Sequence, residues 1–161
     1  MKHVLSVLVN NSSGVLSHVA SLFTRRGYNI ESLCVAETHQ QEHSIITMVV
    51  DEDDKMLSQI ERQLYKLTDV VKVEDLSDRE SIERELVLIT VKSERNRREE
   101  LLSLIEMYQG RIVDMADAAI MIEMIAEPRR IRSFIKVVAE YGIIRMARSG
   151  SIALACLNSD E

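Results

Sequence analysis

The chain has 161 residues, of which 46% are hydrophobic and 29% charged, a balance typical of a globular protein with one medium domain or two small ones. The formal net charge is −6, which argues against a general nucleic-acid binder, because such proteins usually carry a basic excess. The two cysteines, Cys34 and Cys156, suit neither a disulfide framework nor a paired-cysteine metal site, and they favour a reducing, cytoplasmic location.

The first half of the chain predicts the element order βαββαβ. Residues 4–9 form an apolar run typical of a buried strand, and a turn-rich segment, residues 10–14, follows it. The next helix carries apolar side chains at the spacing of one helical face: Val15, Val19, Leu22 and Phe23. Gly27 ends this helix, because glycine readily adopts the left-handed conformation found at helix C-termini. The remaining elements are a helix that begins in the acidic run 51–54 and strands at residues 30–37, 44–50 and 70–76.

The second half repeats this order of elements. Its helices are expected at residues 97–109 and 128–141, and its strands at residues 86–92, 111–115, 119–125 and 143–148, with an additional strand at 151–157. The fold class is therefore α+β, with two tandem ferredoxin-like βαββαβ domains. The first domain is predicted at residues 1–76, a charged linker at 77–85, and the second domain at 86–161.

Each predicted domain has only about 75 residues, a size that is marginal for independent stability. The strands of the first domain are apolar at nearly every position, although its two helices cover only one face of the sheet. The other face therefore needs a cover, and pairing with a second copy of the chain is the simplest one. The sequence predicts a dimer on this ground.

No sequence motif predicts a catalytic nucleophile, a zinc site, a dinucleotide fold or a phosphate loop. His39 and His43 have a spacing that a metal could use, but they lie in a polar loop, which is the simpler interpretation. The acidic run 51–54 is typical of a helix N-terminus, and cation binding there is the alternative. The apolar run at residues 4–9 is too short to cross a membrane. We expect no catalytic residue, no metal site and no cofactor in this chain.

One segment, residues 11–16, predicts a binding site. It places an amide side chain and a glycine between a strand and a helix N-terminus, where backbone N–H groups and the helix dipole favour a carboxylate. Gly14 lets a ligand approach the backbone closely, and Asn11 has both a donor and an acceptor, which suits a zwitterion. Asn29, after the first helix, could complete the site within the chain or across a dimer. From these residues alone, a simple turn and helix cap remains the alternative.

Two longer segments resemble the ACT domain of the acetolactate synthase (acetohydroxyacid synthase) regulatory subunit. They are residues 5–19, LSVLVNNSSGVLSHV, and residues 22–33, LFTRRGYNIESL, in which RGYNIESL is the most specific part. Residues 59–73 and 147–150 are similar to the same family, and the resemblance runs over essentially the whole chain.

The resemblance implies a protein without an active site that binds the catalytic subunit, raises its activity and confers feedback inhibition by valine in branched-chain amino-acid biosynthesis. Thiamine diphosphate, Mg and FAD are expected only on that catalytic partner. The implied valine site combines residues of one ACT domain with residues of its partner in a homodimer. These are Asn11, Gly14, Val15 and Leu16 from one copy and Asn29 and Ile30 from the other. His18 stands where relatives commonly have arginine, which leaves the effector strength and selectivity open.

Two arginine clusters in the second half predict an electrostatic docking surface for the catalytic subunit, with solvated helix faces as the alternative. They are Arg95, Arg97 and Arg98, and Arg129, Arg130 and Arg132. Among other functions, an RNA-binding module is disfavoured because no predicted strand carries an aromatic side chain for base stacking. A small enzyme lacks a nominated catalytic group. A stand-alone amino-acid-responsive regulator with a different partner stays open.

Overall fold

The computed structural model describes residues 2–157 and divides them into two compact units. One unit contains the residues up to Ile82 together with those from Ser151 onward, and the other is Glu83–Gly150. This division differs from the predicted domains 1–76 and 86–161, because the end of the chain groups with the first unit. No helix within residues 2–157 has the length and apolar character needed to span a membrane.

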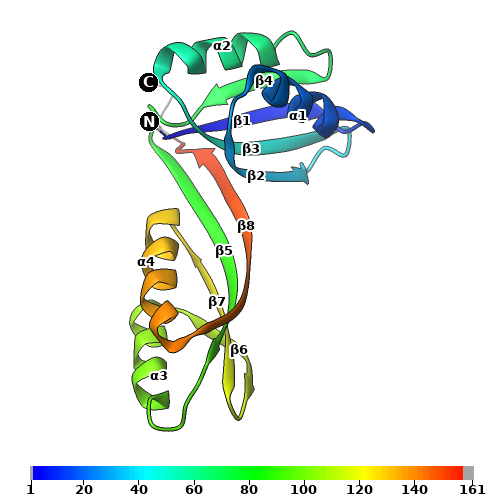
Figure 1. Ribbon diagram of the computed structural model, residues 1–161. Helices are drawn as coiled ribbons and strands as arrows, with labels where there is room; N and C mark the ends of the chain where they lie inside the picture. Colours follow the sequence, from blue (N-terminus) through cyan, green and yellow to red (C-terminus); the bar gives the residue numbers. More distant parts are fainter. Residues whose placement is uncertain (1, 158–161) are drawn as a thin grey trace. The chain divides into compact units, whose positions relative to one another are not determined.

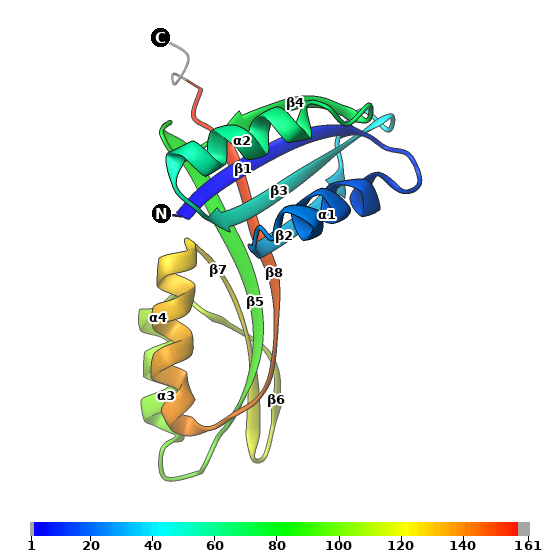
Figure 2. The ribbon, with the colours of Figure 1, turned by 45° about the horizontal axis from the view of Figure 1, so that its top comes forward.

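The first unit has the predicted βαββαβ order. Its elements are β1 (Lys2–Asn10), α1 (Val15–Arg26), β2 (Ile30–Glu37), β3 (His43–Asp51), α2 (Asp54–Leu64) and β4 (Val70–Asp75). The four strands form one antiparallel sheet in the order β2-β3-β1-β4, and both helices lie on the same face of it (Figures 1 and 2). This arrangement confirms the predicted ferredoxin-like fold.

The core of the first unit lies between the sheet and its two helices. Alternate residues of the central strands face the helices, because successive side chains of a strand point to opposite faces. The largest fully buried side chains there are Phe23, Leu5, Ile46, Met48, Ile60 and Leu64. The helix ends follow local rules: Gly27 adopts a left-handed conformation with φ of 71° after α1, and the Asp53 carboxylate accepts the Met56 N–H at 2.7 Å before α2.

The opposite face of this sheet is partly covered by the chain's own C-terminal segment. Ser32 pairs with Val49 in the β2–β3 register, on the face away from the helices, and its Oγ accepts the backbone N–H of Ser151 at 3.0 Å. Ser151 and Ala153 are buried, and so is Thr47, which also lies on this face. The small side chains of this segment allow it to approach the sheet closely. The prediction that this face needs a second copy as its cover was therefore wrong for this part of the sheet.

We expect Ala153→Asp to destabilise the first unit by about 2 kcal/mol, because it places a charge where Ala153 is only 5% exposed. Leu154→Asp is the matched control, because Leu154 is the next residue along and 68% exposed. Hydrogen–deuterium exchange of β1 and β3 peptides measures the local effect. Equal protection in both variants would contradict the role of residue 153 as part of the cover.

The second unit repeats the ferredoxin-like order. Its elements are β5 (Ser81–Lys92), α3 (Arg98–Met107), β6 (Arg111–Ala116), β7 (Ala119–Ala126), α4 (Pro128–Val138), a 3-10 turn (Ala139–Tyr141) and β8 (Ile143–Ala155). The sheet order is β6-β7-β5-β8, and its core joins β5 and β7 to α3 and α4 around Phe134. The first residues of β5 and the last residues of β8 are those that group with the first unit.

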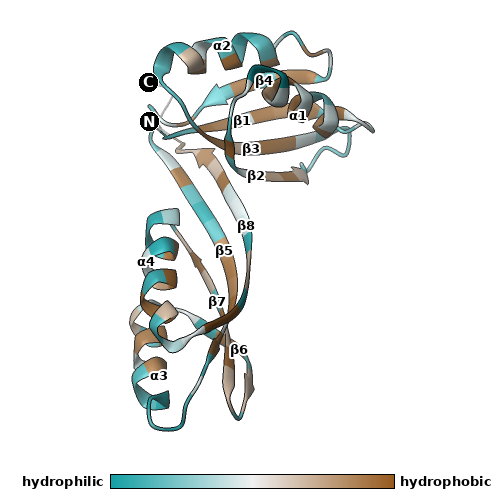
Figure 3. Ribbon diagram, in the orientation of Figure 1, coloured by the Kyte–Doolittle hydropathy of each residue, from teal (hydrophilic) through white to brown (hydrophobic). Residues whose placement is uncertain are grey.

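Two strand predictions in this half were wrong in their extent. β5 begins at Ser81, so residues 81–85 belong to a strand and not to a linker. The strands predicted at 143–148 and 151–157 are one continuous strand, β8. Charged residues at the start of β5 interrupt the apolar run by which a buried strand is predicted. Figure 3 shows that start as mostly hydrophilic and the rest of β5 as largely hydrophobic.

Candidate functional site

The predicted carboxylate cradle lies at the N-terminus of α1. Gly14 is the residue before the helix and has a φ of 88°, a left-handed conformation that favours glycine, and a Cβ added there would meet no atom within 4 Å. Across residues 2–157, the backbone N–H groups of Leu16 and Ser17 find no hydrogen-bond acceptor. Two free donors at the positive end of a helix dipole, beside an open backbone, are an arrangement that favours a carboxylate.

The Asn11 side chain has a more restricted role than its sequence position suggested. Its Nδ2 donates to Glu37 Oε1 at 3.0 Å and to the Gln41 carbonyl oxygen at 2.9 Å. A side-chain amide nitrogen has two hydrogens, so both are used. The opposite amide orientation would place Oδ1 against two acceptors, which disfavours it. Asn11 therefore offers a ligand only its Oδ1 acceptor, which suits an ammonium and not a carboxylate.

A second carboxylate supports the same loop from the other side. The backbone carbonyl oxygen of Asp69 accepts a hydrogen bond from the Asn10 N–H at 2.8 Å. The side-chain Oδ1 of Asp69 accepts one from Ser12 Oγ at 3.4 Å. Its Oδ2 lies 3.4 Å from Nδ1 of His18, in the first turns of α1. The loop that forms the cradle is thus held between the β2–β3 hairpin on one side and the α2–β4 turn on the other.

The structure separates the predicted site residues into two groups. Asn11, Gly14 and Leu16 lie before and at the start of α1, and Leu16 is 44% exposed whereas its neighbour Val15 is buried in the core. Asn29 and Ile30 follow the other end of α1 (Figure 1). The helix has 12 residues and is therefore about 18 Å long. One chain does not bring both groups around a small ligand, which removes the within-chain version of the predicted site.

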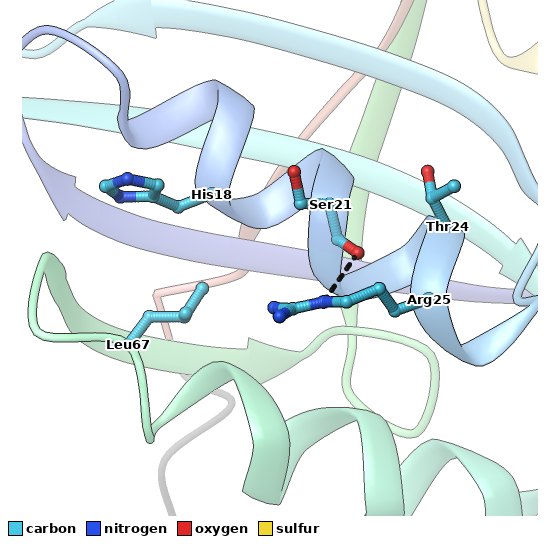
Figure 4. A pocket seen from close by; sticks show the side chains of 5 residues that line it. All are labelled: His18, Ser21, Thr24, Arg25 and Leu67. Carbon is cyan, nitrogen blue, oxygen red and sulfur yellow. Dashed lines mark hydrogen bonds between the residues drawn. The ribbon is translucent and has the colours of Figure 1, made fainter.

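Close to the cradle, a groove of 490 Å³ runs along α1 on the side that faces the α2–β4 turn. His18, Ser21, Thr24, Arg25 and Leu67 line it. Figure 4 shows Arg25 lying along the helix toward His18, with a hydrogen bond of 3.3 Å from its Nε to the Ser21 carbonyl oxygen. His18 thus faces both this groove and Asp69 of the cradle support.

The other candidate sites of the sequence have structural roles. Asp53 of the acidic run caps α2, as the helix N-terminus interpretation predicts. His43 contacts the Gln40 side chain at 3.1 Å within the β2–β3 loop. Within residues 2–157, no group of three or more histidine, cysteine or acidic side chains is arranged to hold a metal ion. Within residues 2–157, Cys34 and Cys156 take part in no disulfide, and both are half-buried.

The first arginine cluster is largely engaged within the second unit. The Arg97 guanidinium lies 4.2 Å from the centre of the Tyr141 ring and 3.3 Å from Glu100. The Tyr141 hydroxyl donates to Glu100 at 2.7 Å and, together with Arg97, holds the pKa of that carboxyl below its ordinary value. Arg98 also donates to groups of its own unit. Arg95 is exposed and has no partner within the described part of the chain.

The second arginine cluster lies at the other end of the helix pair. Arg130, at the start of α4, donates to the Met107 carbonyl oxygen at the end of α3, at 3.3 Å. Arg97, before the start of α3, instead contacts the ring of Tyr141, in the 3-10 turn that follows α4. Arg129 and Arg132 are exposed and, like Arg95, have no partner among residues 2–157. The six arginines therefore form two separate surfaces, and three of them have free guanidinium groups.

Sequence reasoning missed the three residues that hold the cradle loop, Glu37, Gln41 and Asp69. Each is separated from its partner by 26 to 57 residues in the chain. Their residue types gave no signal, because acidic and amide side chains are common in surface turns. Only the sheet register and the turn after α2 bring them to the loop.

The chain is similar to proteins of one family over nearly its whole length. Residues 5–72 match the family model described as AHAS small subunit-like ACT domain, and residues 84–156 match the model described as small subunit of acetolactate synthase. The chain is 42% identical over 154 residues to the probable acetolactate synthase small subunit of Archaeoglobus fulgidus, covering 96% of both chains. It is 37% identical to the acetolactate synthase small subunit of Mycolicibacterium smegmatis, covering 95% of this chain and 90% of that one.

A solved structure agrees with this relation. The acetolactate synthase small subunit from Thermotoga maritima matches with a TM-score of 0.90 and 35% identity, covering 98% of this chain and 99% of that one. Both the sequence and the fold of the two units are therefore those of one protein family. The chain belongs to the acetolactate synthase small-subunit family, and its first half is an ACT domain of that family.

Proposed function

We propose that this chain is the non-catalytic regulatory subunit of acetolactate synthase. It binds the catalytic subunit in the cytoplasm, raises its activity and confers feedback inhibition by valine in branched-chain amino-acid biosynthesis. Thiamine diphosphate, Mg and FAD belong to the catalytic partner. The observation that carries the proposal is the open cradle at Gly14, with two free backbone donors, on an ACT domain of the small-subunit family.

The chemistry of the cradle suits a free α-amino acid. The N–H groups of Leu16 and Ser17 receive the carboxylate of the effector, and Oδ1 of Asn11 accepts a hydrogen bond from its ammonium group. The exposed side chain of Leu16 offers apolar contact to an aliphatic effector such as valine. A ligand that lacks the carboxylate loses the contacts with the two N–H groups, and one that lacks the ammonium group loses the contact with Asn11.

The dimer forms through the β2 edge of the ACT sheet. β2 and β4 are the two edge strands, and β4 is shorter and carries Lys72, a residue type that protects edges from pairing. β2 has no lysine or arginine, and its side chains Leu33 and Val35 are 36% and 41% exposed on the helix-facing side. Pairing with a second β2 covers both the free backbone edge and these apolar side chains.

Antiparallel pairing of two β2 strands also completes the effector site. It sets the start of one strand, at Ile30, opposite the end of the other, at Glu37. Glu37 is the residue that holds Asn11. Asn29 and Ile30 of the second copy thereby come next to the cradle of the first, and they close it over the effector.

Valine regulates the catalytic partner through a difference in affinity between two arrangements of the dimer. An effector shared by two copies favours the arrangement that fits it, and a coupling of about 1–3 kcal/mol is the usual scale. The second unit carries the activating contact. Its free guanidinium groups, on Arg95, Arg129 and Arg132, suit an acidic surface on the catalytic subunit.

Reconstitution with the catalytic subunit tests this function. We expect the full chain to raise acetolactate formation and valine to lower it again, with saturable valine binding by calorimetry at one or two sites per dimer. The same titrations with leucine and isoleucine measure the selectivity of the site among branched-chain amino acids. Valine binding without any effect on acetolactate formation would instead favour a stand-alone amino-acid-responsive regulator.

Val35→Asp is expected to dissociate the dimer and to weaken valine binding by at least tenfold, because a charge at the β2 edge opposes pairing and leaves each cradle open. Val71→Asp is the control, since Val71 lies on the other edge strand with a similar exposure of 47%. Sedimentation and calorimetry measure the two effects. A Val35→Asp monomer that binds valine normally would place the complete site within one chain.

A further inference from the structure

We propose that Asp69 is a positioning residue of the effector cradle, which acts through Ser12 and His18 and couples the occupied cradle to the α2–β4 turn. The inference rests on the proposed function, because the cradle must bind the effector for Asp69 to matter. Asp69 itself contacts no ligand in this proposal. It determines where the free N–H groups of the helix N-terminus point.

The contacts of Asp69 enclose the cradle on both sides along the chain. Its carbonyl oxygen and its two carboxylate oxygens hold three successive parts of the segment: the end of β1 at Asn10, the loop at Ser12 and the start of α1 at His18. Leu16 and Ser17, which carry the free donors, lie between Ser12 and His18. The Asp69 side chain is 24% exposed, so most of it is packed at this junction.

Among residues 2–157, no residue other than Asp69 bonds to both Ser12 and His18. Within the loop, the Ser12 N–H donates to the Asn10 carbonyl oxygen at 3.0 Å, whereas the bond at its helix end, from Val15 N–H to the Ser12 carbonyl oxygen, is weak at 3.5 Å. Gly14 adds the flexibility of glycine at the same end. Loss of the Asp69 carboxylate therefore frees the loop to move relative to the helix. A cradle whose donors are less fixed binds its ligand more weakly, because the ligand must then order them.

Electrostatics alone predicts the opposite effect. A carboxylate near an anion site repels the ligand, so removing its charge should tighten binding. Asp69→Ala removes both the charge and the hydrogen-bond acceptors, whereas Asp69→Asn removes the charge and keeps one acceptor for Ser12. A positioning role therefore predicts weaker binding in Asp69→Ala but unchanged or tighter binding in Asp69→Asn. A role limited to charge predicts the same change in both.

The α2–β4 turn gives the proposal an independent measurement. This turn carries Asp69 and also Leu67, which lines the groove along α1 with His18 (Figure 4). If Asp69 links the cradle to this turn, an effector bound in the cradle slows hydrogen exchange of the turn, at residues 65–70. The link is absent in Asp69→Ala.

The experiment is valine calorimetry and hydrogen exchange on the full chain. We expect Asp69→Ala to weaken valine binding about tenfold and to lose the valine-induced protection of the turn, and Asp69→Asn to bind as well as or better than the natural chain. In a double-mutant cycle, Ser12→Ala should add little to Asp69→Ala. Asp53→Ala is the matched control: it removes the cap of α2 and lowers stability but leaves valine affinity unchanged.

The possible results separate the inference from the proposed function. If the natural chain binds valine and Asp69→Ala binds it equally well, the positioning role is wrong while the proposed function stands. Equal weakening by Asp53→Ala would also overturn it, because general destabilisation would then explain the loss. If the natural chain binds no valine, the proposed function fails, and the inference fails with it.

Discussion

Gly14→Asp is expected to lose valine binding by at least a hundredfold while the fold is retained. The new carboxylate stands at the N–H groups of Leu16 and Ser17, so it repels the effector and competes for the same donors. The free protein has room for the substitution, since an added Cβ meets no atom within 4 Å. Aspartate also tolerates the left-handed conformation better than most residues, which limits the backbone strain to about 1 kcal/mol.

Gly14→Asn is the matched control for this experiment, because asparagine has nearly the same shape and the same tolerance of positive φ without the charge. We expect it to weaken binding less than aspartate does. Calorimetry measures the affinity, and reconstitution with the catalytic subunit measures activation, which should persist in both variants. Full valine inhibition in Gly14→Asp would place the effector elsewhere.

The position of the cradle could be predicted from sequence, but its chemistry could not. A strand, a turn-rich segment and an amphipathic helix place Gly14 at a helix N-terminus on local signals alone. The role of Asn11 depends on Glu37 and Gln41, which reach it only after the sheet has paired. The sequence therefore allowed Asn11 to contact either end of a zwitterion, whereas in the structure both hydrogens of its amide are used and only its Oδ1 is open to a ligand.

The same distinction applies to the fold. The helices and most strands were predictable because their apolar periodicity is a local property, as in β1 and α1. The start of β5 was not, because three consecutive charged residues, 83–85, follow Ser81 and Ile82, and such a charged stretch is shared by linkers and exposed strands. The contact of Ser151 with Ser32 of the first sheet spans more than 100 residues of the chain, and no local sequence pattern predicts it.

Arg148→Met is expected to reduce the stability of the second unit by about 3 kcal/mol. Arg148 binds Glu85 with both ends of its guanidinium, at 2.5 Å from Nε and 2.9 Å from the second nitrogen. Glu85 is only 4% exposed, so the variant leaves a carboxylate buried without its partner. Removing one member of a buried pair costs about 3–5 kcal/mol, and the partial exposure of Arg148 places the expected value at the lower end.

The double variant Glu85→Leu, Arg148→Met separates the cost of a stranded charge from the value of the ion pair itself. Replacing both members by apolar side chains of similar size is often neutral, so we expect the double variant to recover most of the lost stability. Urea unfolding measures the stability of the single and the double variant, and hydrogen exchange in β5 and β8 measures the local effect in each. A double variant as unstable as Arg148→Met would mean that the methylene packing of the arginine, and not its charge, stabilises this strand pair.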